Sequence, residues 1–147
     1  MSSETSDRTS RPAAPEPPVS TSEARTEGLR VHVSAQYSDD HSNPLANHWF
    51  FLYTIRITNE GDERVQLLSR HWVIVDATGE LREVQGEGVV GKQPVLEPGE
   101  TFEYTSGCPL ETPFGKMEGT YRMAREDGSH FEARIARFEL CEPASLH

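Results

Sequence analysis

Three glycines in one short stretch have the spacing of a nucleotide-binding motif. The stretch GEGVVG places Gly86, Gly88 and Gly91 in the pattern G-x-G-x-x-G, and Lys92 follows at once. In a dinucleotide-binding fold such glycines form a tight turn, and the N-terminus of the next helix holds the pyrophosphate. Here two prolines follow closely, and neither an amphipathic helix nor a βαβ pattern surrounds the motif. The sequence therefore does not predict a dinucleotide-binding fold.

A weaker chemistry remains open for the same residues. Successive backbone N–H groups of a glycine-rich loop can point into one concavity, and such nests bind anions without a helix. Lys92 would add positive charge, while Glu87 would oppose an anion. The candidate phosphate-, pyrophosphate- or nucleotide-binding residues are Gly86, Gly88, Val89, Gly91 and Lys92. The alternative, which we prefer on the motif letters alone, is that the glycines only shape a bend between sheet edges.

No other group of side chains has the spacing of a catalytic or metal site. The histidines lack the i, i+4 spacing of a helical zinc pair. Asp39, Asp40, His41 and His48 share one loop and could form a loose carboxylate–imidazole cluster, but a hydrated polar loop is the simpler interpretation. The G-x-S-x-G elbow of serine hydrolases is missing. We expect no catalytic residues, no metal and no cofactor, and hence a protein that is not an enzyme.

Charge and hydropathy limit the partners. The formal net charge is −10, from 24 acidic and 14 basic side chains. Such a chain repels a phosphate backbone, so nucleic acid is not an expected partner. No apolar run approaches the roughly 20 residues that span a bilayer, and we see no secretory signal. The missing apolar run predicts a protein that is not embedded in a membrane. Cys108 and Cys141 are expected to be buried, reduced thiols, which favours a cytoplasmic location.

A hairpin of two long strands precedes the glycine-rich stretch. Between Trp49 and Ile57 every second residue is aromatic or isoleucine, which is the period-2 pattern of a strand. The turn at 59–62 contains Asn, Gly and Asp, which tolerate a chain reversal. The chain then returns through residues 65–76, which are again rich in β-branched and aromatic side chains.

Five further strands are predicted, and helical periodicity is absent. They cover residues 29–37, 81–85, 102–106, 121–125 and 131–140. A change of phase near Ala136-Arg137 predicts a bulge in the last of them. Residues 107–118 are predicted as a loop because of Pro109 and Pro113. About seven strands with short turns indicate an all-β antiparallel β-sandwich, with a small closed barrel as the alternative.

The sequence also predicts where the folded domain begins. Residues 1–27 are rich in Ser, Thr and Pro and carry too few large apolar side chains to offset the entropy of ordering. We therefore predict a disordered N-terminal tail over 1–27 and a single domain over 28–147.

Three segments resemble a known family in order and spacing. They read VQLLSRHWVIVDATGE, VQGEGVVGKQPVLEPGETFEYTSG and ETPFGKMEGTYRM, and from about Gly28 to the C-terminus the chain resembles the bacterial ApaG family. The resemblance implies a fibronectin type III-like β-sandwich and an association with cobalt and magnesium efflux or resistance. The family's glycine motif has been discussed as a phosphate or nucleotide site, and it maps onto Gly86, Gly88 and Gly91. The N-terminal extension departs from the compact family pattern.

The resemblance also bears on partners. Similar domains occur in eukaryotic F-box and polymerase-interacting proteins, which implies an interaction module with a protein partner that is unknown. Our first hypothesis is a non-enzymatic binding module that acts in cobalt and magnesium homeostasis. The alternative is a protein that binds a phosphate-containing small ligand through the loop from Gly86 to Lys92.

Overall fold

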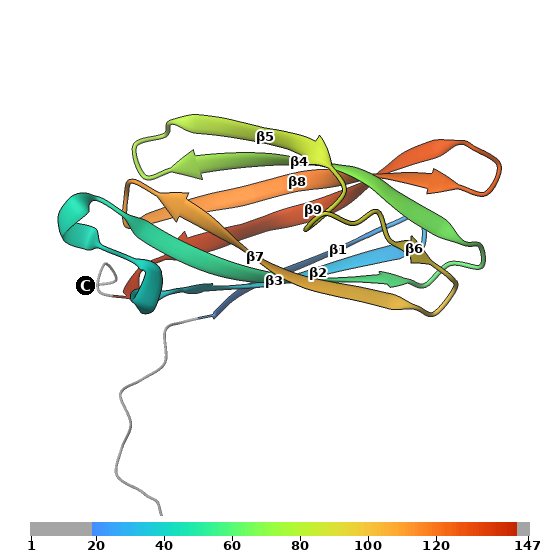
Figure 1. The fold of residues 1–147 in the computed structure, drawn as a ribbon, viewed down its shortest axis with the longest axis horizontal. Coiled ribbons are helices and arrows are strands. Elements are labelled where there is room, and N and C mark those ends of the chain that lie inside the picture. The colour runs from blue at the N-terminus through green and yellow to red at the C-terminus, as the bar shows by residue number, and fades with distance from the viewer. Residues whose placement is uncertain (1–18, 144–147) are drawn as a thin grey trace, which may run out of the picture.

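The computed structural model describes residues 19–143, which form two antiparallel sheets packed face to face (Figure 1). The predicted all-β sandwich is confirmed. One sheet has the order β1-β2-β3-β7. Its strands are β1 (Val19–Thr26), β2 (Leu29–Tyr37), β3 (Trp49–Asn59) and β7 (Thr101–Leu110).

The second sheet has the order β5-β4-β8-β9. Its strands are β4 (Val65–Asp76), β5 (Leu81–Glu87), β8 (Phe114–Arg125) and β9 (His130–Cys141), and the short β6 (Val95–Leu96) pairs with β4. Two short 3-10 helices, η1 (Asp39–His41) and η2 (Pro44–Ala46), lie in the connection between β2 and β3. No helix among residues 19–143 is long and apolar enough to cross a membrane.

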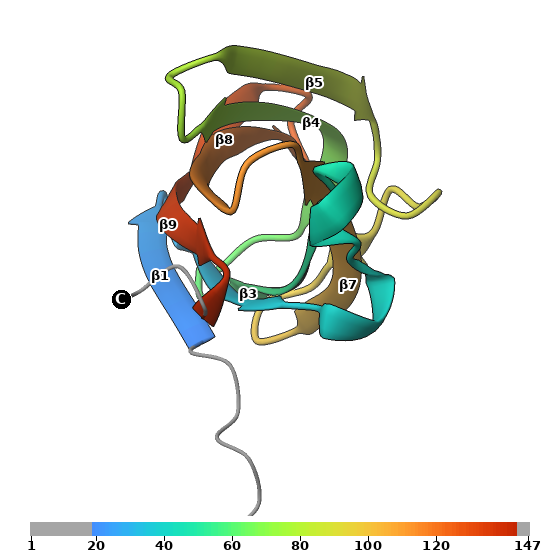
Figure 2. The same cartoon turned by 90° about the vertical axis from the view of Figure 1, so that its left-hand side faces the viewer.

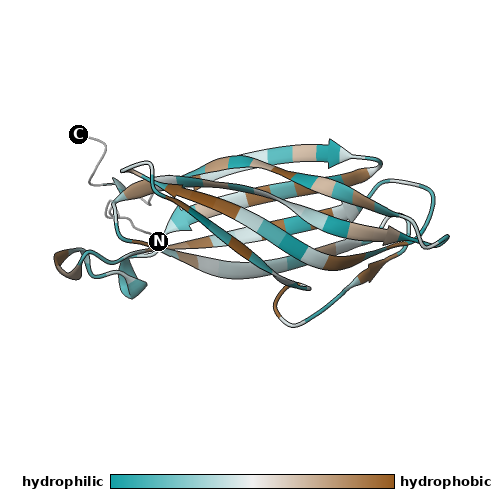
Figure 3. Ribbon diagram, turned by 90° about the horizontal axis from the view of Figure 1, so that it is seen from above, coloured by the Kyte–Doolittle hydropathy of each residue, from teal (hydrophilic) through white to brown (hydrophobic). Residues whose placement is uncertain are grey.

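The core follows the predicted alternation of side chains. Phe51, Ile55 and Ile57 of β3 are fully buried, while Leu52 and Arg56 face outward. Apolar and polar residues alternate along most strands of both sheets, as the banding in Figure 3 shows. Burying a large apolar side chain contributes about 1.5–3 kcal/mol. The two apolar faces thus hold the sheets together.

The first strand corrects the predicted extent of the tail. Residues 19–26 form β1, which pairs with β2 along its whole length, so the predicted disorder is wrong for these residues. Hydroxyl groups of β1 bind the backbone of the neighbouring edge strand β9: Ser22 Oγ donates to the carbonyl of Ala136 (2.7 Å), and Thr26 Oγ1 accepts from the N–H of Arg134 (3.0 Å). The serines and threonines therefore form a seam that closes one side of the sandwich (Figure 2). The predicted disorder of residues 1–18 lies outside the described residues.

The predicted loop over 107–118 is also wrong, because β7 continues to Leu110 and β8 begins at Phe114. Pro109 is tolerated because β7 is an edge strand, where a residue without an N–H can face away from the sheet. The predicted bulge in the last strand is confirmed. Ala136 and Arg137 together lie opposite the single residue Glu118, since the register shifts between Met117 and Gly119.

The other side of the sandwich remains open. The free edges of β5 and β7 face each other there without pairing, and we call the space between them the mouth. Arg82 of β5 spans one end of it by donating from Nη2 to the carbonyl of Pro109 (3.0 Å). From Gly88 to Leu96 the chain crosses in front of the sandwich on its way to β6 (Figure 1). The glycine-rich stretch thus lies at the mouth.

Candidate functional site at the open mouth

The glycine motif forms a tight two-residue turn at the end of β5. The N–H of Val89 donates to the carbonyl of Lys92 (2.8 Å), and the N–H of Lys92 donates back to the carbonyl of Val89 (2.9 Å). The two central residues have positive φ, +43° at Val90 and +79° at Gly91. This is the type I′ geometry that suits a hairpin. No helix follows, so the turn is not a dinucleotide motif.

Gly88 and Gly86 of the motif each occupy a position where a side chain would collide with a neighbouring group. Gly88 has φ +66°, and a side chain there would collide with the carbonyl oxygen of Lys92. Gly86 is a residue of β5 paired with Arg70, rather than part of the bend. A Cβ at Gly86 would lie 2.8 Å from Nη1 of Arg70 and 3.0 Å from its Cζ. The absence of a side chain at Gly86 therefore lets the guanidinium of Arg70 cross β5.

The turn leaves a few donors available at the mouth. The N–H of Gly88 donates to the carbonyl of Leu68 (2.8 Å), and the side chain of Val89 is buried in the core. Within residues 19–143, the N–H groups of Val90 and Gly91 meet no acceptor. Of the five predicted site residues, Gly91 contributes an available amide and Lys92 contributes its exposed side chain. Gly88 and Val89 act on the shape of the loop, and Gly86 makes room for Arg70.

Arg70 also lines the mouth, although no motif in the sequence indicates it. In β4 the register against β8 shifts between Leu67 and Ser69, so Leu68 is an extra residue. Beyond this bulge the buried residues are Trp72 and Ile74, which places Arg70 on the same inner face. The sequence contains one sign of this bulge: apolar residues change from odd to even positions between Leu67 and Trp72. The same kind of change predicted the bulge near Ala136.

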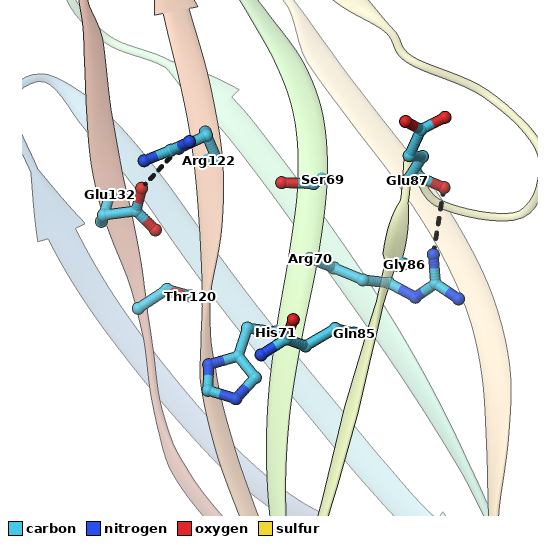
Figure 4. A pocket seen from close by; sticks show the side chains of 9 residues that line it. All are labelled: Ser69, Arg70, His71, Gln85, Gly86, Glu87, Thr120, Arg122 and Glu132. Atoms are coloured by element: carbon cyan, nitrogen blue, oxygen red, sulfur yellow. Dashed lines mark hydrogen bonds and ion pairs between the residues drawn. The ribbon is translucent and has the colours of Figure 1, made fainter.

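The guanidinium of Arg70 contacts carbonyl groups instead of an acid. Nη1 donates to the carbonyls of Glu87 (3.1 Å) and Gly88 (2.8 Å), as the first of these bonds shows in Figure 4. Among the described residues, no carboxylate pairs with Arg70, and no hydrogen bond uses its Nη2 or Nε. The positive charge of Arg70 is therefore not neutralised by an ion pair.

The hydroxyl groups of Tyr53, Tyr104 and Ser106 lie on the inner wall of the mouth, and the fully buried Tyr121 lies behind Tyr104. Tyr104 and Tyr121 share a short hydrogen bond of 2.5 Å between their hydroxyl oxygens. Burial raises the pKa of both groups above the ordinary value for tyrosine, and the nearby Arg70 offsets part of this effect. Burial also raises the pKa of Tyr53, against a hydrogen bond with Ser106. The hydroxyls thus stay protonated near neutral pH and can donate hydrogen bonds.

These groups line one hollow of about 260 Å³. Its walls are Tyr53, Arg70, Trp72, Glu87, Val89, Val90, Gly91, Tyr104 and Ser106. The hollow thus joins the available amides of the turn, an arginine and several hydroxyls, which together are donors suited to an anion. Glu87 is the one acid among them.

A larger hollow, of about 660 Å³, lies on the outer face of the second sheet (Figure 4). Arg70, Gly86 and Glu87 line this hollow too, while its remaining charged side chains are paired. Arg122 Nε donates to Glu132 (3.0 Å), and His71 Nε2 lies 2.6 Å from Glu83. Arg70 thus lines both hollows, but only the smaller one adds the amides of Val90 and Gly91 and is free of these ion pairs, so it is the better candidate for an anion.

The loop that could have formed a carboxylate–imidazole cluster is arranged differently. His41 Nδ1 lies 2.6 Å from Ser38 Oγ, and the ring of His48 stacks on Phe50. In the part of the chain that the structure describes, no three His, Cys, Asp or Glu side chains come together in a group able to hold a metal ion. Asp39 and Asp40 lie in η1 and are exposed.

Known proteins share both the sequence and the fold. The family described as the ApaG domain matches residues 39–125. Protein ApaG of Methylobacterium sp. (strain 4-46) is 58% identical over 120 residues, which cover 82% of this chain and 92% of that protein. Protein ApaG of Anaeromyxobacter dehalogenans (strain 2CP-C) is 54% identical over 126 residues, which cover 86% and 99%. The crystal structure of the ApaA protein from Bordetella pertussis superposes with a TM-score of 0.77 at 48% identity and covers 88% of this chain and 98% of that one. The chain therefore belongs to the ApaG domain family.

Proposed function

We propose that this protein is a binding module that holds an anionic, phosphate-bearing ligand at the mouth. The observation that carries the proposal is Arg70, an inward-facing arginine that meets only carbonyl groups in a chain of formal net charge −10. Within the described residues, two amides of the adjacent turn also lack an acceptor. An arginine fork together with backbone amides is a combination that binds phosphate groups well.

Binding is a better proposal than turnover for this site. A hydrolase would need a base to activate water, and a base must lose its proton near neutral pH. Burial raises the pKa of the Tyr104 hydroxyl at the hollow, so it acts as a hydrogen-bond donor instead. Glu87, the one carboxylate of the hollow, is exposed, and among residues 19–143 no side chain is hydrogen-bonded to this carboxylate to orient it as a base. Pure protein should therefore bind pyrophosphate without releasing phosphate from it. Release that is abolished by Arg70→Gln would contradict this part of the proposal.

The binding test is an amide NMR titration with inorganic phosphate and pyrophosphate. We expect the signals of Val90 and Gly91 to move, and we expect Arg70→Gln to weaken binding about tenfold or more, since hydrogen bonds between charged groups are the strong ones. Arg122→Gln is the matched control, because Arg122 lies on the outer face in a pair with Glu132. Equal weakening by both substitutions, or no movement at Val90 and Gly91, would reject the site.

We propose further that the module serves cobalt and magnesium homeostasis in the cytoplasm, as the family resemblance implies. A complementation experiment tests whether this role depends on the mouth. A strain that lacks the gene should grow poorly at raised cobalt, the wild-type gene should restore growth, and the Arg70→Gln gene should fail to do so. Full restoration by Arg70→Gln would separate the physiological role from the mouth.

A further inference from the structure

The backbone of β7 presents unpaired groups to the mouth. The carbonyl of Phe50 in β3 accepts a hydrogen bond from the N–H of Ser38 (2.8 Å). The backbone N–H and carbonyl of Phe50 therefore point toward β2 and away from β7. Antiparallel pairs alternate between hydrogen-bonded and non-hydrogen-bonded, and Phe50 pairs with Pro109. Pro109 therefore belongs to a non-hydrogen-bonded pair. By the same alternation Gly107 and Thr105 direct their N–H and carbonyl groups away from β3, toward the free edge.

Only one end of this edge is covered. Pro109 has no N–H, and its carbonyl accepts from Arg82. Thr105 and Gly107 meet no partner across the mouth within residues 19–143. An edge with free N–H and carbonyl groups is a template for an added strand. The open length accommodates about three residues of a peptide, at about 3.4 Å per residue.

The edge leads directly to the anion site. The neighbouring residues Tyr104 and Ser106 line the same hollow as Val90, Gly91 and Arg70. Beyond this point the segment from Gly88 to Leu96 crosses the front of the sandwich (Figure 1). A strand that enters beside Gly107 and runs antiparallel to β7 therefore has to end at the turn. A chain end carries a carboxylate there, opposite an arginine and two available amides.

We propose that the mouth binds the C-terminal residues of a partner protein by adding them as a short antiparallel strand to β7. Strand addition and capture of a terminal carboxylate by backbone amides are both known modes of peptide recognition. The proposal rests on the anion site proposed above and names the class of its ligand. Arg70, Val90 and Gly91 hold the carboxylate, while Thr105 and Gly107 pair with the peptide backbone.

The walls of the mouth also indicate the side chains of such a peptide. Val84 of β5 and Val90 of the turn are 37% and 54% exposed. Val90 lines the hollow, and Val84 lies on the edge strand β5 opposite the buried Trp72. An apolar side chain of the peptide that points inward would cover both. Peptides of β-branched residues lose little conformational entropy when they adopt the extended conformation of a strand. A peptide that ends in Thr-Val-Thr-Val is therefore a suitable probe.

The test titrates full-length protein with acetyl-Thr-Val-Thr-Val that has a free carboxylate, and with the same peptide as a C-terminal amide. We expect the acid to move the amide signals of Thr105, Gly107, Val90 and Gly91, and the C-terminal amide to bind about tenfold more weakly. Thr105→Pro removes one donor from the free edge, where proline is tolerated as it is at Pro109. It should weaken the acid peptide about tenfold while phosphate still binds.

The matched control is Thr101→Pro, which introduces the same residue at the first position of the same strand, outside the mouth. It should bind the peptide as the wild type does, and thermal unfolding of both variants shows that they are folded.

Equal binding of the acid peptide and the amide peptide, or wild-type affinity of the acid peptide for Thr105→Pro, would overturn the proposal. Phosphate binding without peptide binding would overturn it and leave the anion site standing. If neither ligand moves Val90 and Gly91, both proposals fail. A protein that is dimeric until Thr105→Pro is introduced would show that a second copy occupies the edge, which also overturns the proposal.

Discussion

The guanidinium of Arg70 lies directly over the Cα of Gly86, where a Cβ would stand 2.8 Å from Nη1. The first glycine of the motif, Gly86, thus makes room for the side chain of Arg70 and does not form a phosphate-binding turn. Gly86→Ala should push the flexible end of Arg70 aside at a cost of less than about 1 kcal/mol in the free energy of unfolding, because a movable side chain can give way. Phosphate affinity should nevertheless fall. Denaturant unfolding and a phosphate titration measure the two effects, and wild-type affinity in Gly86→Ala would contradict this account of Arg70.

The turn stores backbone strain at Val90. This β-branched residue has φ +43°, in a region where asparagine and glycine are favoured. Val90→Asn should raise the free energy of unfolding by up to about 1 kcal/mol, because the conformational penalty is relieved. The backbone amide remains, so phosphate binding should be retained. Denaturant unfolding measures the gain, and a loss of stability would show that packing of the Val90 side chain outweighs the strain.

The buried tyrosine pair predicts a loss of stability at high pH. Burial raises the folded-state pKa of Tyr104 and Tyr121, so the folded protein favours the protonated hydroxyls more than the unfolded chain does. Their contribution is therefore complete below about pH 10, the ordinary pKa of tyrosine, and is lost as pH rises above that value toward the folded pKa. Urea unfolding between pH 8 and pH 12 should show this decline. The double variant Tyr104→Phe, Tyr121→Phe should show a shallower decline, and an unchanged slope would refute the assignment.

The hydroxyl seam makes a prediction for β1. Ser22→Ala removes the hydrogen bond to the carbonyl of Ala136 and should lower the free energy of unfolding by about 0.5–1.5 kcal/mol. Thr21→Ala is the control, since Thr21 is exposed on the same strand. Amide hydrogen exchange in β1 should also become faster in Ser22→Ala. Equal effects of both substitutions would show that the seam adds nothing specific.

Much of the fold could be predicted because it follows local rules. The period-2 pattern of β3 and the phase change near Ala136 both report which side chains face the core, and both predictions are confirmed. β1 could not be found in this way, because its hydroxyls satisfy the backbone of β9, which is distant in sequence. The continuation of β7 through Pro109 depends on the strand being at an edge, which only the assembled sheet reveals.

The candidate site was predicted only in part. The glycine letters located the loop, but the available donors depend on which amides the turn consumes, and Gly88 and Val89 spend theirs internally. Arg70 reaches the mouth through the bulge at Leu68 and the bare surface of Gly86. The role of Arg70 thus arises from two strands together, and no single stretch of sequence contains it.

The most direct measurement of the central claim is a crystal structure of the protein soaked with tungstate, whose anomalous signal marks a phosphate-like anion. We predict a peak at the mouth, within hydrogen-bond distance of the guanidinium of Arg70 and the amides of Val90 and Gly91. Peaks that occur only elsewhere, for example beside Arg122 on the outer face, or an empty mouth at full occupancy of another site, would contradict the claim.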